Sequence, residues 1–167
     1  MSDEELLEAI KQEEAELQFE SFTNETALRL GQSIVERAKA DRLPVTVRIR
    51  RGAQLLFHCA CEGTSADNDD WVERKARVVE RFGRSTYYME VSQRLSGKPF
   101  AEQYLLDPTL YVPWNGGFPI VARGFGPIGS VAVSGLPGDG DHALIVAALR
   151  DILGKPAVPA KNLDPSN

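Results

Sequence analysis

Hydrophobic positions along the chain repeat with two different periods, which predict helices around two strand-rich regions. Near the N-terminus, Leu6, Ile10 and Leu17 recur at the spacing of an α-helix. This apolar stripe is thin, because residues 1–20 also carry eight acidic side chains against a single lysine. We therefore expect an acidic helix that either lies solvated on the edge of the domain or acts as an arm for a partner or a second subunit.

A second helix is predicted to begin at Thr23 or Asn24, since either side chain can accept a hydrogen bond from the free amides of a first turn. Pro44 marks the latest position at which this helix can stop. Its buried face consists of small and apolar residues three or four positions apart, namely Ala27, Leu28, Gly31, Ile34, Val35 and Ala38.

The period then changes from 3.6 to 2, which indicates strands. Val45, Val47 and Ile49 alternate with polar residues, and a turn at Arg51 leads into a second strand over residues 54–61. Both faces of this second strand are largely apolar, so we expect both sides of the sheet to be covered.

Two further helices follow this hairpin. The acidic run at residues 67–70 is expected to cap a third helix, which Gly83 ends in a left-handed conformation. Ser85 or Thr86 begins a fourth helix, and Gly97 ends it.

The last third of the chain contains a long connection, two strands and a helix. Residues 98–119 form an irregular, aromatic-bearing segment, and connections of this length are typical of functional or interfacial loops. Strands are predicted near 118–123 and 127–134, and Asp141 is expected to cap a helix over 143–153. This element order predicts an α+β fold, with an antiparallel sheet flanked by helices.

Composition sets the domain organisation. With 167 residues, 43% of them hydrophobic and 26% charged, the chain has the profile of one globular domain. We divide it into an acidic helical arm (1–22), an α+β domain (23–154) and a C-terminal tail with three prolines (155–167).

Charge and hydropathy exclude some classes of function. A net charge of −5 argues against a protein that binds nucleic acid by neutralising phosphates. No apolar run reaches the roughly 20 residues that a membrane span needs. The acidic N-terminus is unlike a signal peptide, so a cytoplasmic location is expected.

Several residue combinations suggest a metal site or a catalytic triad but have a simpler structural interpretation. Cys59 and Cys61 lack the second Cys/His pair of a structural zinc site, so core packing is the favoured role. Ser134, Asp141 and His142 are the residue types of a hydrolase triad, but Ser134 lacks the flanking glycines of a nucleophile elbow. We therefore assign no catalytic residue and no metal site.

The histidines and a group of cations are the remaining candidates. His58 and His142 are the only conventional haem ligands in the chain, although a hydrogen-bonded core position and an inert surface position, respectively, also account for them. Five cations lie within eleven residues, and they form either a solvated face or a cradle for an anion: Arg74, Lys75, Arg77, Arg81 and Arg84.

Three stretches near the C-terminal half carry a recognisable pattern: residues 116–120 (GGFPI), residues 126–135 (GPIGSVAVSG) and Asp141. The pattern resembles the haem-degrading-domain superfamily that includes the HbpS and GlcG proteins. Residues 67–75 and 82–86 are similar to an uncharacterised branch of it. The likeness extends over residues 24–153, and its motif positions are Gly116, Gly117, Pro119, Gly129, Gly135 and Asp141.

The resemblance implies a profilin-like α+β fold and assembly into homo-oligomers. In some members it also implies haem or corrinoid binding, or haem breakdown. Our leading hypothesis is a non-enzymatic module that binds a small planar acid such as haem or that serves in assembly.

The candidate pocket combines residues from several predicted elements. Arg74 and Lys75 would hold a carboxylate, Ser85 would donate a hydrogen bond, Trp114 would stack on the ligand, and Ser134 would line the same pocket. Two alternatives stay open: a haem-degrading enzyme with His58 or His142 as axial ligand, and a protein–protein adaptor that uses the acidic N-terminal helix.

Overall fold

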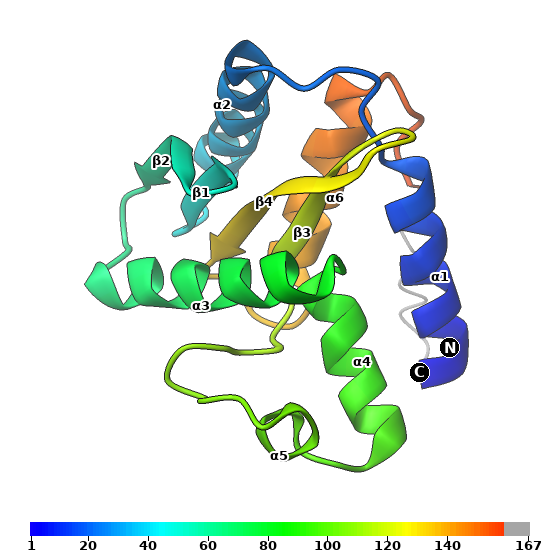
Figure 1. Ribbon diagram of the computed structural model, residues 1–167. Coiled ribbons are helices and arrows are strands. Elements are labelled where there is room, and N and C mark those ends of the chain that lie inside the picture. The colour runs from blue at the N-terminus through cyan, green and yellow to red at the C-terminus, as the bar shows by residue number, and fades with distance from the viewer. Residues whose placement is uncertain (159–167) are drawn as a thin grey trace, which may run out of the picture.

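The computed structural model describes residues 1–158 and arranges them as six helices and four strands (Figure 1). In chain order the elements are α1 (Asp3–Glu16), α2 (Asn24–Ala40), β1 (Thr46–Arg51), β2 (Gln54–Ala60), α3 (Ala66–Phe82), α4 (Thr86–Ser96), α5 (Phe100–Tyr104), β3 (Gly117–Ala122), β4 (Gly126–Ser134) and α6 (Gly140–Ile152).

The strands form one antiparallel sheet in the order β2-β1-β4-β3. Val47 of β1 lies opposite Cys59 of β2 on one side and opposite Val133 of β4 on the other. Phe118 of β3 lies opposite Val131 of β4. The predicted α+β class, an antiparallel sheet flanked by helices, is confirmed.

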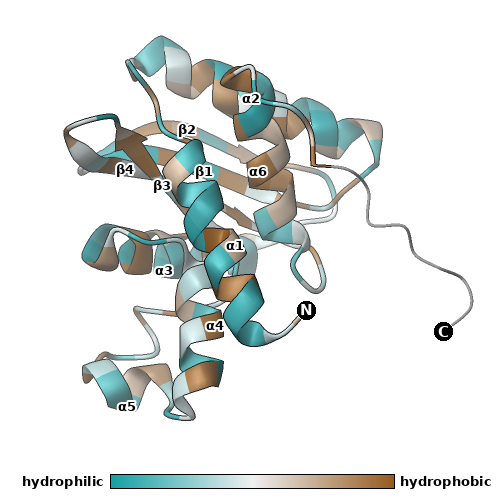
Figure 2. Ribbon diagram, turned by 90° about the vertical axis from the view of Figure 1, so that its right-hand side faces the viewer, coloured by the Kyte–Doolittle hydropathy of each residue, from teal (hydrophilic) through white to brown (hydrophobic). Residues whose placement is uncertain are grey.

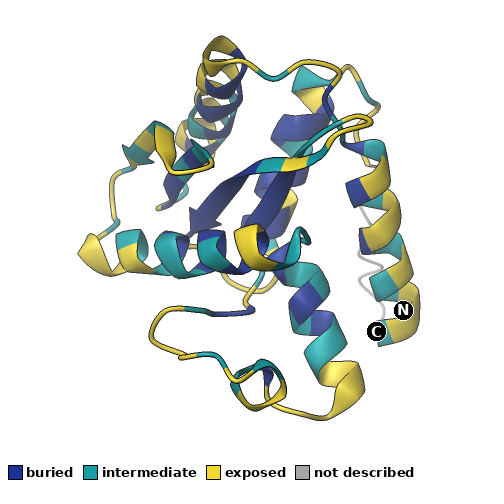
Figure 3. Cartoon of the chain, viewed as in Figure 1, coloured by how far each residue is buried: buried dark blue, intermediate teal, exposed yellow. Residues whose placement is uncertain are grey.

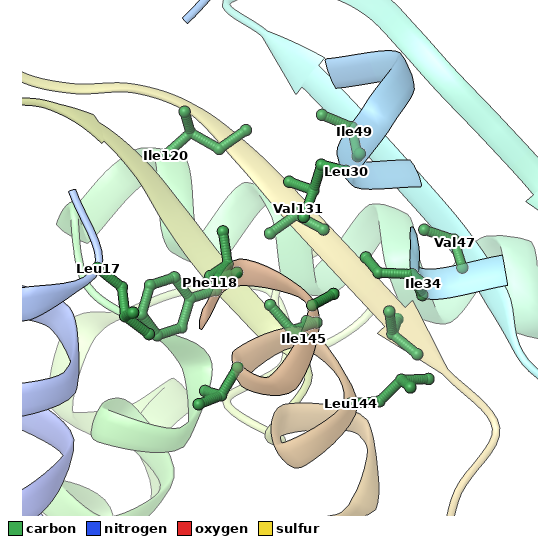
Figure 4. Close-up of a cluster of buried hydrophobic side chains, with 14 of the residues drawn as sticks. Leu17, Leu30, Ile34, Val47, Ile49, Phe118, Ile120, Val131, Leu144 and Ile145 are labelled. Atoms are coloured by element: carbon green, nitrogen blue, oxygen red, sulfur yellow. The ribbon is translucent and has the colours of Figure 1, made fainter. Parts of the chain in front are cut away.

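The two faces of the sheet are covered by different helices. α2 and α6 pack on one face and α3 on the other (Figure 1). Because side chains alternate along a strand, Val131 and Val133 of β4 enter the core beneath α2 and α6, while Ala132 packs on α3. Figure 4 shows the larger core cluster, whose labelled members include Leu30, Ile34, Val47, Phe118 and Ile145.

The α3 side of β1 carries charge rather than apolar packing. Arg48 and Arg50 both donate hydrogen bonds to Glu73 of α3, and Arg50 also bonds Glu80. Burial raises the pKa of Glu73, but hydrogen bonding from Arg50 together with the positive charges of Arg50, Arg77 and Arg48 leaves the pKa below its ordinary value. This network joins α3 to the sheet.

The predicted covering of both faces does not extend to β2. Its side chains are exposed or half-buried, and Leu55 is 54% exposed. β2 is an edge strand that α2 contacts from one side, so apolar residues on both of its faces do not mean burial on both.

Helix starts differ from the predictions at two places. α3 begins one residue before the acidic run, and its N-cap is Ser65, whose backbone amide donates to Asn68. α6 begins at Gly140, so Asp141 lies inside the first turn and its carboxylate binds partners outside the helix. The left-handed stop at Gly83 is confirmed.

The acidic N-terminal helix packs against the rest of the fold. Ile10 and Leu17 are buried, and the segment after α1 joins the sheet through Phe19, whose amide donates to the carbonyl of Val121 over 2.8 Å. Figure 3 shows exposed residues along one side of α1, and Figure 2 shows that much of its surface is hydrophilic. The domain boundaries at residues 22 and 154 remain a prediction, and residues 159–167 of the predicted tail lie outside the described residues.

No helix among residues 1–158 is both long enough and apolar enough to cross a bilayer.

Candidate functional site

A cavity of about 480 Å³ lies where the N-terminal half of α3, the end of β4 and the start of α6 meet. We call it the tryptophan pocket, because the chain has two tryptophans and both line it. Its lining residues are Asp67, Asn68, Trp71, Lys75, Glu90, Trp114, Asn115, Ser134, Gly135, Leu136, Gly138 and Asp141.

α3 supplies one wall of the tryptophan pocket through Asn68, Trp71 and Lys75, which share a helix face because they are three and four positions apart. The Asn68 side-chain amide donates to the Ser134 hydroxyl over 3.3 Å and thereby holds the end of β4. Asn115, opposite, donates to the carbonyl of Gly138 over 2.9 Å. The polar side chains of the wall are thus fixed before any ligand arrives.

Lys75 and Asp141 form a buried ion pair at the base of the pocket. The Lys75 ammonium donates to Asp141 over 2.9 Å and to the carbonyl of Val133 over 2.8 Å. Asp141 also accepts the Leu136 amide over 2.9 Å. Burial lowers the pKa of Lys75 below its ordinary value, and the Asp141 charge opposes this.

The close packing around this pair explains one glycine of the motif. Gly116 has a φ of +110°, and a Cβ there would lie 2.5 Å from the carbonyl oxygen of Val133 and 2.7 Å from the Lys75 nitrogen. Only glycine fits this backbone conformation and this approach. Gly116, Lys75 and Asp141 therefore belong to one structural junction.

Free hydrogen-bonding capacity in the tryptophan pocket is small. An ammonium has three N–H groups, so Lys75 retains one after its two bonds. The Ser134 hydroxyl accepts from Asn68 and keeps its own proton to donate. A ligand that offers one acceptor oxygen, such as a carbonyl or a single carboxylate, matches these two donors.

The charge of the lining limits what can bind. Asp67, Glu90 and Asp141 set three carboxylates against the single ammonium of Lys75. Because Lys75 is already paired with Asp141, each negative charge on a ligand is repelled by Asp67 and Glu90, and a ligand with one carboxylate meets less of this repulsion than a ligand with two. Trp114, 46% exposed, and Trp71 offer aromatic surface for a flat molecule.

Three of the five predicted ligand-binding residues, Lys75, Trp114 and Ser134, line this pocket, and two do not. Arg74 points along α3, where it stacks on Trp71 and pairs with Asp70. Ser85 is buried as the N-cap of α4, and its hydroxyl accepts the Tyr88 amide over 3.1 Å. The proposed donor and half of the proposed carboxylate clamp are thus engaged elsewhere.

The predicted group of cations is largely neutralised within the chain. Arg77 pairs with Glu73, and Arg84 with Glu14 of α1, while Arg81 lies over the ring of Tyr111. An anion cradle on this part of α3 would have to displace these partners.

Neither histidine presents a free Nε2 atom as a haem ligand within residues 1–158. The Nε2 atom of His58 lies 2.8 Å from Asp69, and that of His142 lies 2.8 Å from Glu13. His142 is buried beside the rings of Tyr87 and Phe118. Together with the acids of the tryptophan pocket, these pairs make a poor fit for an iron porphyrin with two carboxylates.

The structure does not form the catalytic triad or the metal site that was considered from the sequence. Asp141 holds Lys75 and His142 holds Glu13, so these two do not form a relay to Ser134. Cys59 and Cys61 are free thiols, and burial raises the pKa of Cys61, an effect that Cys59 reinforces. Among the described residues there is no group of three or more side chains suited to a metal ion.

The pocket residues that were not predicted as ligand contacts include Asp67, Asn68, Trp71, Glu90 and Asn115. Asn68 was treated only as part of a capping run, although its spacing to Lys75 places the two on one helix face. Glu90 accepts the Asn115 amide over 2.8 Å, a long-range contact for which the sequence carries no local signal.

A family model described as "Haem degrading protein HbpS-like" matches residues 22–150. The chain belongs to the HbpS-like family. This confirms the family that the glycine motifs indicated. A UPF0303 protein of Streptomyces avermitilis is 44% identical over 147 residues, which cover 88% of this chain and 90% of that protein. A UPF0303 protein of Mesorhizobium japonicum is 43% identical, with 87% of each chain covered.

Solved structures agree with this HbpS-like assignment. The Ybr137w protein superposes with a TM-score of 0.82 at 28% identity, covering 90% of this chain and 89% of its own. HbpS gives a TM-score of 0.63 at 25% identity, covering 82% and 93%. PduOC, solved as a complex with heme, gives 0.65 at 19% identity over 77% and 93%, which shows a shared fold.

Proposed function

We propose that this HbpS-like protein is a non-enzymatic module that binds a small, flat, monocarboxylate ligand in the tryptophan pocket. The observation that carries the proposal is the convergence of both tryptophans on one cavity whose base holds a buried lysine with a remaining N–H. The cavity volume of about 480 Å³ lies within the usual range for sites of small organic molecules.

Each part of the pocket has a distinct role in this proposal. The indoles of Trp71 and Trp114 contact the faces of the ligand, and the third N–H of Lys75 meets its carboxylate. Ser134 donates a second hydrogen bond. Asp67 and Glu90 select against additional negative charge, so haem with two carboxylates is expected to bind here more weakly than a monoacid.

Haem remains the ligand that the family description points to, and it therefore belongs in the same experiment. Its breakdown, the enzymatic alternative, needs a bound haem first. A titration that compares haem with monoacids thus decides between the small-ligand proposal and the haem alternative.

The proposal is tested by titration with nicotinate, a flat monocarboxylate, and with nicotinamide, which has the same shape without the charge. Intrinsic tryptophan fluorescence reports on this pocket alone, because the chain has no tryptophan elsewhere. We expect saturable quenching by nicotinate, and nicotinamide about tenfold weaker. Equal binding of the two would overturn the role of Lys75, and no change with either, or with haemin, would overturn binding in this pocket.

Matched variants separate the pocket from general surface effects. Trp114→Ala removes one exposed indole, and Phe125→Ala removes an aromatic ring that is 84% exposed on the β3–β4 turn and lines no part of the pocket. Calorimetric titration, which does not depend on tryptophan, should show nicotinate binding lost in Trp114→Ala and retained in Phe125→Ala.

We further propose that the protein acts in the cytoplasm as a homo-oligomer. Large apolar side chains are exposed on its surface, including Leu55, Leu105 and Leu110, and they could be buried in a contact between subunits. Light scattering coupled to size exclusion tests this: a mass of about 18.4 kDa, that of one chain, would contradict self-assembly.

A further inference from the structure

A second cavity, of about 460 Å³, lies between α1 and α6 and is lined in part by His142. We call it the α1–α6 groove. Leu6, Ala9, Ile10 and Glu13 line it from α1, at positions i, i+3, i+4 and i+7. This spacing is one helix face, so the wall continues over about two turns, or roughly 10 Å.

α6 provides the opposite wall with the same spacing. Ala143, Val146, Ala147 and Arg150 line the groove at i, i+3, i+4 and i+7. The small side chains at 143 and 147 leave the space between the two helices unfilled at these points. The result is a long apolar slot between two helices rather than a broad, flat one.

Two polar side chains on this apolar wall are buried and only partly satisfied. Arg150 is 8% exposed, and it donates one hydrogen bond, to Glu16 over 3.0 Å, of the five that a guanidinium can make. Its Nε atom has no partner within residues 1–158. The Nδ1 atom of His142, a residue 5% exposed, likewise has none there. Buried groups of this kind cost free energy unless something bonds them.

The charges of the groove are segregated. Arg150 and Arg37 contribute to the lining near the C-terminal end of α6, where Arg150 pairs with Glu16 over 3.0 Å and Arg37 pairs with Asp151 over 3.8 Å, so a bound carboxylate would share these cations with their present partners. Glu13 and Asp139 lie toward the N-terminal end of α6, where Glu13 is bonded to His142. The cations of the lining therefore lie toward the C-terminal end of α6, and the acids lie toward its N-terminal end.

We propose that the α1–α6 groove binds an aliphatic monocarboxylate, a medium-chain fatty acid, with its carboxylate at Arg150 and Arg37. A guanidinium binds a carboxylate through two parallel hydrogen bonds, which uses the donors that Glu16 leaves free. The alkyl chain lies along Leu6, Ala143 and Ala147, which line the groove and are half-buried or exposed, and it displaces water from their apolar surface. This site is separate from the tryptophan pocket, and either can fail without the other.

The test is calorimetric titration of the full chain with octanoate, decanoate and dodecanoate, each below its micelle concentration, and with dodecanol. We expect saturable binding that tightens with chain length. Dodecanol, which lacks the charge, should bind about tenfold more weakly than dodecanoate. Absence of saturable binding, or equal affinity for the acid and the alcohol, would overturn the proposal.

Variants locate the binding. Ala147→Phe places a ring in the slot from a half-buried helix position, and Ala40→Phe adds the same ring to an exposed helix position that lines neither cavity. Dodecanoate affinity should fall about tenfold in Ala147→Phe and stay unchanged in Ala40→Phe. Arg150→Gln should remove the preference for acid over alcohol. Unchanged binding in Ala147→Phe would place the ligand elsewhere and refute the groove.

Nicotinate titration of the same variants keeps the two sites distinguishable. The groove contains no tryptophan, so a fatty acid that occupies it should leave the nicotinate response of Trp71 and Trp114 in place. Competition between dodecanoate and nicotinate would mean that both ligands enter the tryptophan pocket, and it would overturn the separate groove site.

Discussion

Replacing Lys75 by methionine tests the buried junction on which the tryptophan pocket is built. The change keeps most of the side-chain volume but removes the ammonium that bonds Asp141 and the Val133 carbonyl. At the 2.9 Å separation of the pair, two unit charges attract by about 6 kcal/mol at an effective dielectric constant of 20. Desolvation of both ions offsets much of this attraction.

The loss of one partner costs more than the pair's net contribution, because Asp141 is left charged and buried. We expect Lys75→Met to lower the free energy of unfolding by about 3–5 kcal/mol, measured by urea denaturation. Asp141→Asn preserves an acceptor for the Leu136 amide. The double variant should therefore recover stability relative to Lys75→Met, since it leaves no uncompensated charge.

Two results would rule out a buried, interacting pair of Lys75 and Asp141. A loss below about 1 kcal/mol in Lys75→Met would mean that the pair is not buried as described. Additive losses in the double variant would mean that the two side chains do not interact.

Three other predictions concern stability. The pKa of Lys75 is lowered in the folded chain, so the unfolded chain binds this proton more tightly. The free energy of unfolding of the wild type, relative to that of Lys75→Met, should therefore rise as the pH increases from the lowered pKa toward 10.5. Urea denaturation at several pH values would show this rise. The pKa of Glu73 is also lowered, so its contribution to the free energy of unfolding is present above about pH 4.5 and is lost as the pH falls below that value. When the two proteins are matched for stability at about pH 7, acid unfolding should begin at a higher pH in the wild type than in Glu73→Gln. Identical acid-unfolding profiles would contradict this prediction. Ile10→Ala should cost about 2–5 kcal/mol if α1 is an integral part of the fold, whereas a melting temperature equal to that of the wild type would favour a detachable arm.

Much of the fold could be predicted from the sequence because the signals are local. The alternation at Val45, Val47 and Ile49 depends only on neighbouring residues, and so does the left-handed glycine at position 83. The family followed from the glycine motifs at 116–117 and 126–135, which meet backbone requirements such as the positive φ of Gly116.

The candidate site was harder to predict, because its side chains are selected by long-range partners. Arg74 and Lys75 are adjacent in sequence, yet one stacks on Trp71 at the surface and the other is buried against Asp141. Ser85 has a hydroxyl that could donate a hydrogen bond to a ligand, but it serves as the N-cap of α4. A cluster of cations in sequence therefore did not predict a cluster of free cations in space.

The same distinction applies to the acidic N-terminal helix. Its sequence indicates a solvated surface, and three of its seven acids, Glu4, Glu5 and Glu8, are exposed. Glu14, however, is buried, where it accepts the Ser85 amide over 2.7 Å and pairs with Arg84. The adaptor hypothesis required a helix that could be removed without cost, and these contacts predict a measurable loss of stability on its deletion.

A crystal structure of the protein grown with nicotinate would show directly whether the tryptophan pocket binds a flat monocarboxylate. We expect ligand density between Trp71 and Trp114, with a carboxylate oxygen within hydrogen-bonding distance of the Lys75 nitrogen. An empty pocket at a nicotinate concentration that saturates the calorimetric signal, or a ligand bound with its carboxylate away from Lys75, would rule out the proposed site.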